Sequence, residues 1–216
     1  ALKSGDGELE LRCVDVAASL GSGVSRVEVL MTFFNQYQGS GSVEGELDFP
    51  LPESATVCGY SLEVEGHLVP ASIVEKEKAR VAFEEEVRSG NQASLVEVVK
   101  GNSFKVRVYP LRPREEKRVL VSFVSDLEPF GDNLAGILIP FKSANPLARV
   151  SFNVQAYTHP LLPLPKVISN FSDLHFSPVD KSTGLSTISK EMTNVNLDTV
   201  HLLLPVPTPG SPPVVH

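Results

Sequence analysis

The sequence has few of the features by which several protein classes are recognised. Only two cysteines occur among 216 residues, which excludes a disulfide scaffold. No apolar run approaches the roughly 18 residues that a membrane-spanning helix needs, and no basic-then-apolar signal pattern opens the chain, so we expect a soluble protein. The net charge of −7 is spread along the chain without a basic cluster. Neither nucleic acid nor a membrane surface is therefore expected as a partner.

The two cysteines bear weakly on the cellular compartment. Cys13 and Cys58 lie in segments that alternate apolar and polar residues, as strands do. Two small core side chains with free thiols are the first interpretation, and one bridge between strands is the alternative. Free thiols favour a cytoplasmic location, whereas the triplet Asn170-Phe171-Ser172 fits a glycosylation acceptor. An extracellular location therefore stays open.

Alternation with a period of two recurs along nearly the whole chain and predicts a mainly β protein. The link Gly21-Ser22-Gly23 is too short for a parallel crossover, so the strands on either side of it are expected to be antiparallel neighbours. Glu65-Gly66 similarly predicts a hairpin turn. The expected strands are residues 8–17, 24–37, 43–51, 55–65, 67–74, 94–99, 103–109, 117–124, 136–141, 148–157, 165–169, 174–177, 185–190 and 199–204.

Only residues 74–95 carry a clear helical period. Apolar side chains recur on one face there: Ala79, Ala82, Phe83 and Val87. Gly90 follows, as a helix-ending residue commonly does. We therefore predict one amphipathic helix near residues 76–89.

Several positions in the first part of the chain together resemble one known family. They are Phe49, Pro50, Gly59, Gly66, Glu75, Lys76, Ala79, Phe83, Gly90, Ala93 and Leu95. With the later runs FKVRVYPLRP and VLVSFVSDL, they make the chain similar to a vault protein inter-alpha-trypsin (VIT) domain from about residue 8 to 127. This module occurs in inter-alpha-trypsin inhibitor heavy chains, in vault-associated poly(ADP-ribose) polymerase and beside von Willebrand factor A domains. The resemblance implies an antiparallel β-sandwich with one amphipathic helix docked on it.

The resemblance also suggests a division of the chain. Residues 1–127 would be the VIT core, and residues 128–204 would add strands that complete the sandwich or form a second small β unit. Residues 205–216 are proline-rich and read as a linker or tail. The chain is then the N-terminal part of a larger protein. Its partner would be an A-type domain further along the same chain or another protein of unknown identity.

Sequence motifs of catalysis are missing. The chain has no G-x-S-x-G elbow, no P-loop and no histidine or cysteine spacing typical of zinc, so neither a catalytic residue nor a cofactor or metal is expected. Asp180-Lys181-Ser182-Thr183-Gly184 is the nearest match to the metal motif of an A domain, but it lacks the final Ser and reads as a turn. The expected function is a non-catalytic interaction or scaffold module.

The alternative is an enzyme, or enzyme subunit, that uses carboxylates in a cleft. Glu86 is the candidate, because it falls within the apolar face of the predicted helix, where relatives commonly carry Ala. A carboxylate buried there would have to be paired or protonated. A position at the rim of the stripe with the carboxylate in water is the plainer interpretation, and a salt link to a neighbouring strand is another.

Two surfaces are candidates for binding a protein partner. The first is the outer face of the predicted helix, with Arg80, Glu84 and Arg88. The second is the segment from Tyr109 to Arg118, the densest positive stretch in the chain, with Arg112, Arg114, Lys117 and Arg118. Because two glutamates dilute this charge, an ordinary solvated loop is the alternative.

Overall fold

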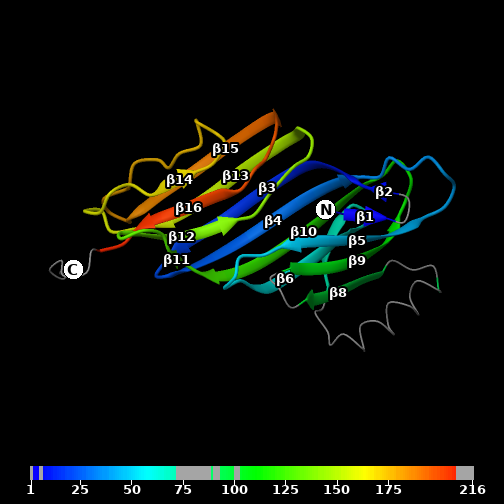
Figure 1. Cartoon of the computed structure of the whole chain (residues 1–216), viewed down its shortest axis with the longest axis horizontal. Coiled ribbons are helices and arrows are strands. Elements are labelled where there is room, and N and C mark those ends of the chain that lie inside the picture. The colour runs from blue at the N-terminus through cyan, green and yellow to red at the C-terminus, as the bar shows by residue number, and fades with distance from the viewer. Residues whose placement is uncertain (1, 5–6, 72–88, 90–92, 100–102, 208–216) are drawn as a thin grey trace.

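The structure is a computed structural model of the whole chain (Figure 1). It describes residues 2–4, 7–71, 89, 93–99 and 103–207, and the side chains of residues 2–4, 7–8, 93–99 and 103 are not described. Of the predicted helix near residues 76–89, residues 76–88 therefore lie outside the described residues, and Ser89 is in a turn. Within the described part, no helix is long and apolar enough to cross a membrane.

Two tight hairpins follow from local turn chemistry. Strand β3 (Glu10–Gly21) turns through Ser22 and Gly23 into β4 (Val24–Phe34), and the φ angles of these two turn residues are 52° and 82°. Strand β6 (Thr56–Val64) turns through Glu65 and Gly66 into β7 (His67–Pro70), with φ angles of 50° and 85°. Two consecutive positive φ angles give the turn whose twist suits paired strands. Both predicted hairpins are confirmed.

A seven-stranded sheet, here called the long sheet, runs through the molecule (Figure 1). Its strands follow the spatial order β15 (Leu185–Val195), β13 (Leu147–Tyr157), β3, β4, β10 (Glu116–Asp126), β6 and β7. Along β4 and β10 the burial alternates, so each strand turns one row of side chains inward and the other outward.

Two smaller sheets lie side by side on the long sheet (Figure 1). The five-stranded sheet has the order β2 (Gly7–Glu8), β1 (Leu2–Ser4), β5 (Val43–Pro50), β9 (Ser103–Leu111) and β8 (Ala93–Val99). The four-stranded sheet has the order β11 (Glu128–Pro129), β12 (Leu134–Ile139), β16 (Val200–Pro205) and β14 (Lys166–Ile168).

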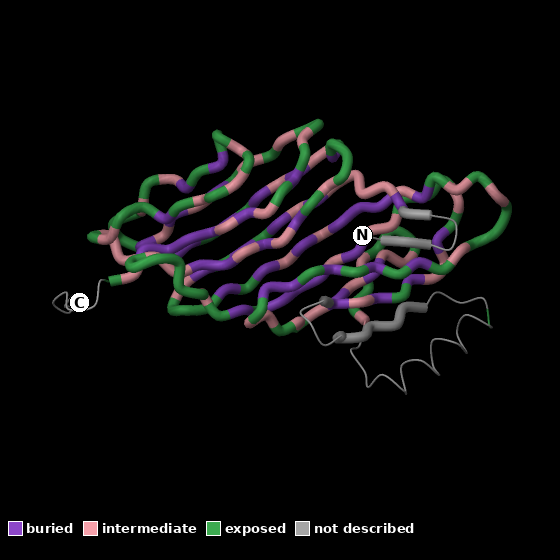
Figure 2. Tube along the Cα trace, in the orientation of Figure 1, coloured by how far each residue is buried: buried purple, intermediate pink, exposed green. Residues whose placement is uncertain are grey.

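One hydrophobic core joins the three sheets (Figure 2). Phe123 of β10 packs against Phe49 of β5, with 6.5 Å between the ring centroids. On the same face of the long sheet, Phe152 of β13 packs against Phe171, which follows β14, at 6.4 Å. Both small sheets therefore cover a single face of the long sheet, which makes the described part a two-layered β structure.

The sequence predicted most of the strands, but it missed the short strands β1 and β11 and predicted one strand that does not form. Residues 174–177 form no strand, although Leu174 and Phe176 alternate as a strand would and are both buried. They belong to a loop held beside β15, where the Ser177 amide donates to the Thr187 carbonyl at 2.8 Å. The apolar residues alternate there because the loop inserts the side chains of Leu174 and Phe176 into the core.

The expectation of a wholly antiparallel arrangement is also wrong at one pair. Strand β13 runs parallel to β3, with Val150 opposite Val14 and Ala156 opposite Leu20. The chain forms the four-stranded sheet's β11 and β12 before it returns to the long sheet, so β13 enters from the end that gives parallel pairing. Apolar alternation carries no information about strand direction. The division of the chain at residues 127 and 204 stays a prediction.

Both cysteines are free thiols, but Cys58 is exposed and not in the core as expected. The cause is a β-bulge in β6, where Val57 lies opposite Phe123 and Gly59 lies opposite Ser122. Cys58 is the extra residue between them, and a bulge re-aims the side chain of such a residue.

Candidate functional site

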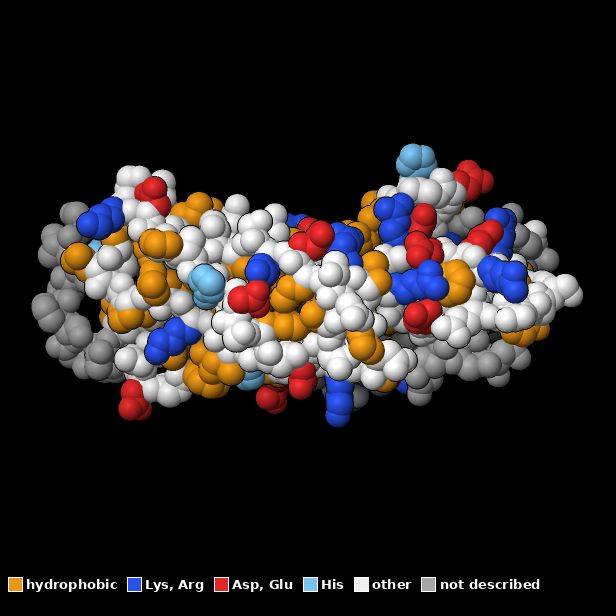
Figure 3. Space-filling view, turned by 90° about the horizontal axis from the view of Figure 1, so that it is seen from above, with side chains coloured by type: hydrophobic (Ala, Val, Ile, Leu, Met, Phe, Trp, Pro, Cys, Tyr) orange, Lys and Arg blue, Asp and Glu red, His pale blue; other side chains and the backbone are white. Residues whose placement is uncertain are grey.

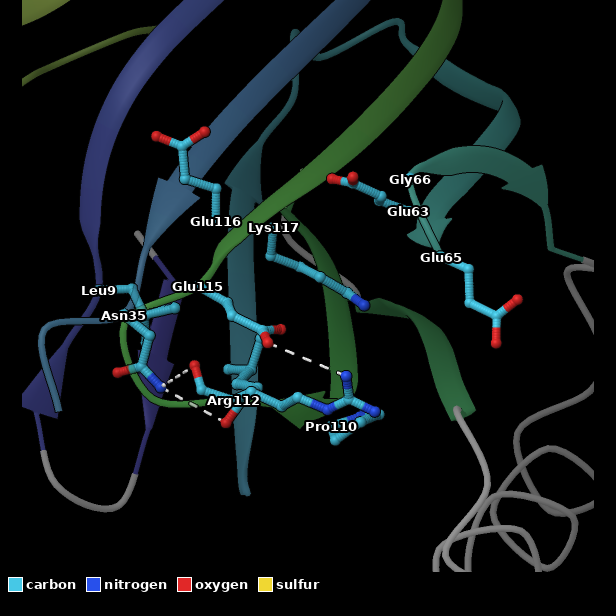
Figure 4. Close-up of a pocket in the computed structure, with 11 residues that line it drawn as sticks. Leu9, Asn35, Glu63, Glu65, Gly66, Pro110, Arg112, Glu115, Glu116 and Lys117 are labelled. Carbon is cyan, nitrogen blue, oxygen red and sulfur yellow. Dashed lines mark hydrogen bonds and ion pairs between the residues drawn. The ribbon is translucent and has the colours of Figure 1, made fainter. Parts of the chain in front are cut away.

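The predicted basic loop joins β9 to β10 and lines a small pocket of about 120 Å³ (Figure 4). It lies beside the hairpin of β6 and β7, which contributes Glu63, Glu65 and Gly66 to the same pocket. Of the predicted loop residues, Arg112 and Lys117 line this pocket, whereas Tyr109, Arg114 and Arg118 do not. The other predicted surface, formed by Arg80, Glu84 and Arg88, lies outside the described residues, as does Glu86.

Asn35, just after β4, fixes the path of this loop. Its side chain is 4% exposed, and its Nδ2 donates to the backbone carbonyls of Leu111 at 3.4 Å and Arg112 at 3.2 Å. Its Oδ1 accepts the backbone N–H of Tyr37 at 3.1 Å. One buried amide therefore bonds three backbone groups of two separate segments.

The backbone of Asn35 holds the loop as well. Its N–H donates to the Glu115 carbonyl at 3.1 Å, and its carbonyl accepts from the Arg114 amide at 2.9 Å. Arg114 has a φ of 58°, in the left-handed region that non-glycine residues seldom adopt. The loop is therefore a fixed turn that carries exposed side chains.

Arg112 and Arg114 are the two basic side chains that the loop leaves in solvent. Arg112 lies 3.9 Å from Glu115, with the two side chains 58% and 57% exposed. An exposed pair at that distance contributes little to stability. The guanidinium of Arg112 can therefore exchange this contact for a partner at small cost.

Arg118, in contrast, is engaged within the protein. Its Nε and Nη2 donate to the two carboxylate oxygens of Glu63 at 3.1 and 3.3 Å, and its Nη2 also donates to the Gly66 carbonyl at 2.7 Å. Its backbone N–H donates to Glu63 at 3.0 Å. This two-pronged pairing ties β10 to the hairpin of β6 and β7.

The electrostatics of the pocket follow from this pairing. Burial raises the pKa of Glu63, but the hydrogen bonds and charge of Arg118 outweigh burial and hold the pKa below the ordinary value of 4.5. Burial lowers the pKa of the Lys117 ammonium, the charge of Glu63 opposes that effect, and the charge of Arg112 adds to it. Sequence reasoning missed Glu63 and Asn35, because each acts on residues more than fifty positions away.

The Glu63–Arg118 pair gives a prediction that depends on pH. We expect Glu63→Gln to lower the free energy of unfolding by about 1–2 kcal/mol at pH 7, in the lower part of the range for charged hydrogen bonds because Arg118 is 38% exposed. Since the folded pKa of Glu63 is depressed, its stabilisation is complete above the unfolded value near 4.5 and is lost as pH falls through the folded value. Urea unfolding at pH 7 and at pH 3 would measure the decrease.

Glu53→Gln, at an exposed position, is the matched control and should change stability little at pH 7. A difference between wild type and Glu63→Gln that stays constant at both pH values would contradict the assignment.

Some of the positions that carried the family resemblance lie in described strands and turns, and the others lie outside the described residues. Phe49 is 2% exposed and packs against Phe123 and, at 6.1 Å, against Phe141, so it links both small sheets to the core. Gly66 takes the φ of 85° that its hairpin needs, and Pro50 ends β5. Gly59 lies in β6, and Ala93 and Leu95 lie in β8. The remaining positions lie outside the described residues: Glu75, Lys76, Ala79, Phe83 and Gly90.

Within the described part of the chain, no group of three or more His, Cys, Asp or Glu side chains is placed to hold a metal ion. The site described above is a rigid, basic turn beside a small pocket, on a two-layered β module. Residues 11–123, more than half of the chain, match the family described as the Vault protein inter-alpha-trypsin domain. The chain belongs to this family.

Several curated proteins are similar to the chain over part of their length. Protein mono-ADP-ribosyltransferase PARP4 of Mus musculus is 32% identical over 48% of this chain and 5% of its own length. A von Willebrand factor A domain-containing protein of Dictyostelium discoideum is 28% identical over 70% of this chain and 16% of its own. The von Willebrand factor A domain-containing protein 5A of Rattus norvegicus is 25% identical over 75% and 20%. The chain thus spans a fifth or less of the length of these relatives.

Proposed function

We propose that the chain is a non-catalytic protein-interaction module within a larger protein that also carries a von Willebrand A-type domain. The observation that carries this proposal is membership of the VIT family together with alignments to relatives named for their A domains. These alignments take in most of this chain and a small part of each relative. The partner is an A-type domain of the same chain or another protein.

The fixed loop between β9 and β10 supports a binding surface of defined shape. Arg112 and Arg114 stand exposed on a turn that Asn35 anchors, so few conformations are lost when a partner binds. Arg118 donates hydrogen bonds to Glu63, so its guanidinium holds the turn in place. Within the predicted surface, we therefore assign partner contact to Arg112 and Arg114, with Tyr109 and Lys117 beside them.

The partner surface that fits these residues is acidic. Elsewhere the charges are mixed: Figure 3 shows Lys and Arg interspersed with Asp and Glu over one face of the molecule. Two exposed guanidiniums on one rigid turn would orient a partner and speed its association more than they would add to its final affinity. The helix surface with Arg80, Glu84 and Arg88 stays a prediction of the same kind.

One of the relatives is named as an enzyme, a mono-ADP-ribosyltransferase. The alignment takes in 5% of that protein, and no observation on the described residues favours catalysis by this chain. Glu86, the candidate carboxylate of the enzyme alternative, lies outside the described residues.

We expect the double reversal Arg112→Glu with Arg114→Glu to weaken capture of the A-type domain. The loss should be larger at low salt than at physiological salt, because exposed charges are screened over about 8 Å at 0.15 M. Surface-bound A-type domain from the full-length protein, titrated with each variant at two salt concentrations, measures the association rate and the affinity.

Lys166→Glu with Lys181→Glu is the matched control, since it changes the net charge equally at two exposed lysines away from the loop. If both double variants lose binding equally, general charge and not the loop is responsible. If neither loses binding, the loop is not the contact surface.

A further inference from the structure

The long sheet has an open edge at β15. This strand pairs with β13 on one side only, and Figure 1 shows it along the upper border of the molecule. The N–H and C=O groups of a strand residue point to the same side, and successive residues alternate between the two sides. Every second residue of β15 therefore turns its backbone groups away from β13.

The first outward-facing residues of β15 are bound by a loop of the same chain. The Leu185 carbonyl accepts from the Asp180 amide at 2.8 Å, and the Thr187 carbonyl accepts from the Ser177 amide at 2.8 Å. The Thr187 amide donates to the Ser177 hydroxyl at 2.9 Å. The odd-numbered residues of β15 are therefore the ones that face outward.

The second half of this edge is open. Because the register with β13 does not shift along β15, Ser189, Glu191 and Thr193 also turn their N–H and C=O groups outward. Within the described part of the chain none of these outward groups has a hydrogen-bond partner, and all three residues are exposed. Asn194 leaves the extended conformation with a φ of 55°. The open stretch therefore runs from residue 188 to residue 193.

The side chains around this stretch carry a net negative charge. Arg149 of β13 donates to Asp15 at 2.8 Å and to Glu191 at 3.4 Å, so one guanidinium serves two carboxylates. Lys190 pairs with Asp173 at 2.6 Å. Three carboxylates thus stand against two cations. The side chain of Glu191 is 61% exposed, so it can reach a cation on a strand that lies beside β15.

We propose that residues 188–193 of β15 bind an extended peptide segment of a partner protein, which adds one strand to the long sheet and places a basic residue opposite Glu191. In recognition by strand addition, main-chain hydrogen bonds give affinity and alternate side chains give specificity. Antiparallel pairing is the more stable arrangement per residue. On the other face of the sheet, the half-buried Met192 would contact an apolar side chain of the peptide.

A second copy of β15 fits this edge poorly. Antiparallel pairing of two copies about Glu191 would place two carboxylates directly opposite each other, which destabilises a sheet. Pairing shifted toward the start of β15 meets the loop already bound at Thr187. Pairing shifted the other way meets the change of backbone direction at Asn194. A short basic segment of another chain avoids all three conflicts.

The peptide acetyl-Thr-Val-Lys-Thr-Thr-amide is a suitable probe, because its lysine lies opposite Glu191 when its ends lie opposite Thr193 and Ser189. We expect saturable one-to-one binding in a titration up to about 5 mM, followed by the amide signals of the isotope-labelled chain. On binding, hydrogen exchange should slow at the amides of residues 189, 191 and 193. It should change little at residues 190 and 192, whose amides face β13.

N-methylation of the peptide separates main-chain pairing from attraction between side chains. A methyl group on the lysine amide, which faces β15, should weaken binding by about tenfold or more, because it removes a donor and obstructs the approach of the strands. A methyl group on the valine amide, which faces away, is the matched control and should change binding by less than about twofold. Equal effects of the two methyl groups would contradict strand addition.

Variants of the chain test the same edge. Ser189→Pro should weaken peptide binding about tenfold without unfolding the sheet, because the N–H that it removes faces solvent. Glu191→Lys should weaken binding about two- to fivefold, and a peptide with glutamate in place of lysine should then regain the loss. Glu128→Lys, at an exposed position of β11, is the matched control and should leave binding unchanged.

Absence of saturable binding, unchanged exchange at the outward amides, or no effect of Ser189→Pro or Glu191→Lys would each overturn the proposal. Protection of the outward amides that rises with the concentration of the chain alone would reveal a second copy at the edge and would also overturn it. The reversal of Arg112 and Arg114 should leave peptide binding unchanged. The strand-addition site and the proposed function of the basic loop can therefore fail separately.

Discussion

Phe123→Ala should be the most destabilising of the substitutions considered for this fold, lowering the free energy of unfolding by about 3–5 kcal/mol. Phe123 has no exposed surface, and it lies on β10 between β4 and β6, facing Phe49 of the five-stranded sheet. Removal of the ring deletes apolar burial and leaves a cavity where two sheets meet. Chemical denaturation with a signal from the tyrosines or from far-UV dichroism measures the change.

Phe130→Ala provides the matched control, because the same ring is removed at a position that is 41% exposed. Within the described residues, the ring of Phe130 packs edge to face against the ring of His201, with 5.6 Å between the ring centroids. We expect a cost of about 1 kcal/mol or less there, since less surface is buried and water can refill the space. Similar losses at the two sites would mean that the packing of the two layers is not the main source of stability.

Asn35→Ala is expected to have the second largest effect, about 2–3 kcal/mol. The substitution leaves the carbonyls of Leu111 and Arg112 and the amide of Tyr37 without their partner. A buried polar group left unpaired costs about 1–3 kcal/mol. Only the contact with the Leu111 carbonyl is buried and the other two are partly buried, so the expected loss is smaller than three full penalties. The loop that carries Arg112 should also loosen, which hydrogen exchange at Arg114 and Glu115 would detect.

Asn35→Asp distinguishes the hydrogen bonds from simple packing. The carboxylate keeps the acceptor for the Tyr37 amide but places a second oxygen against the two carbonyls, so it should be no more stable than the alanine variant. Asn153→Ala, at an exposed position of β13, should change stability by less than about 0.5 kcal/mol. A fully stable aspartate variant would show that Asn35 fills space without directing the loop.

The sequence was informative wherever structure depends on neighbours along the chain. Ser22-Gly23 and Glu65-Gly66 specify their turns through their own φ angles, so both hairpins could be predicted. Alternation of apolar residues located most strands for the same reason. It failed at Leu174 and Phe176, because burial of two side chains from a loop gives the same pattern as a strand.

The residues that hold the candidate site in place could not be predicted from neighbouring residues in the sequence. Arg112 and Arg118 read alike in the sequence, but one is exposed and the other is bound by Glu63 from a different strand. Asn35 is an ordinary polar residue after a strand, and its role depends on a loop 76 positions away. Long-range pairing, and not residue type, decides which basic side chains are available to a partner.

The parallel pairing of β3 with β13 has a consequence for how the chain folds. Asp15 and Ser151 lie opposite each other in this pair, 136 positions apart, so the edge of β3 is completed late during synthesis. Until then a nascent chain presents an unpaired strand whose inner row is Val14, Val16, Ala18 and Leu20. Such an edge can pair with another chain, and distant contacts form slowly. Ribosome-bound intermediates that end before β13 would accordingly depend on chaperones to stay apart.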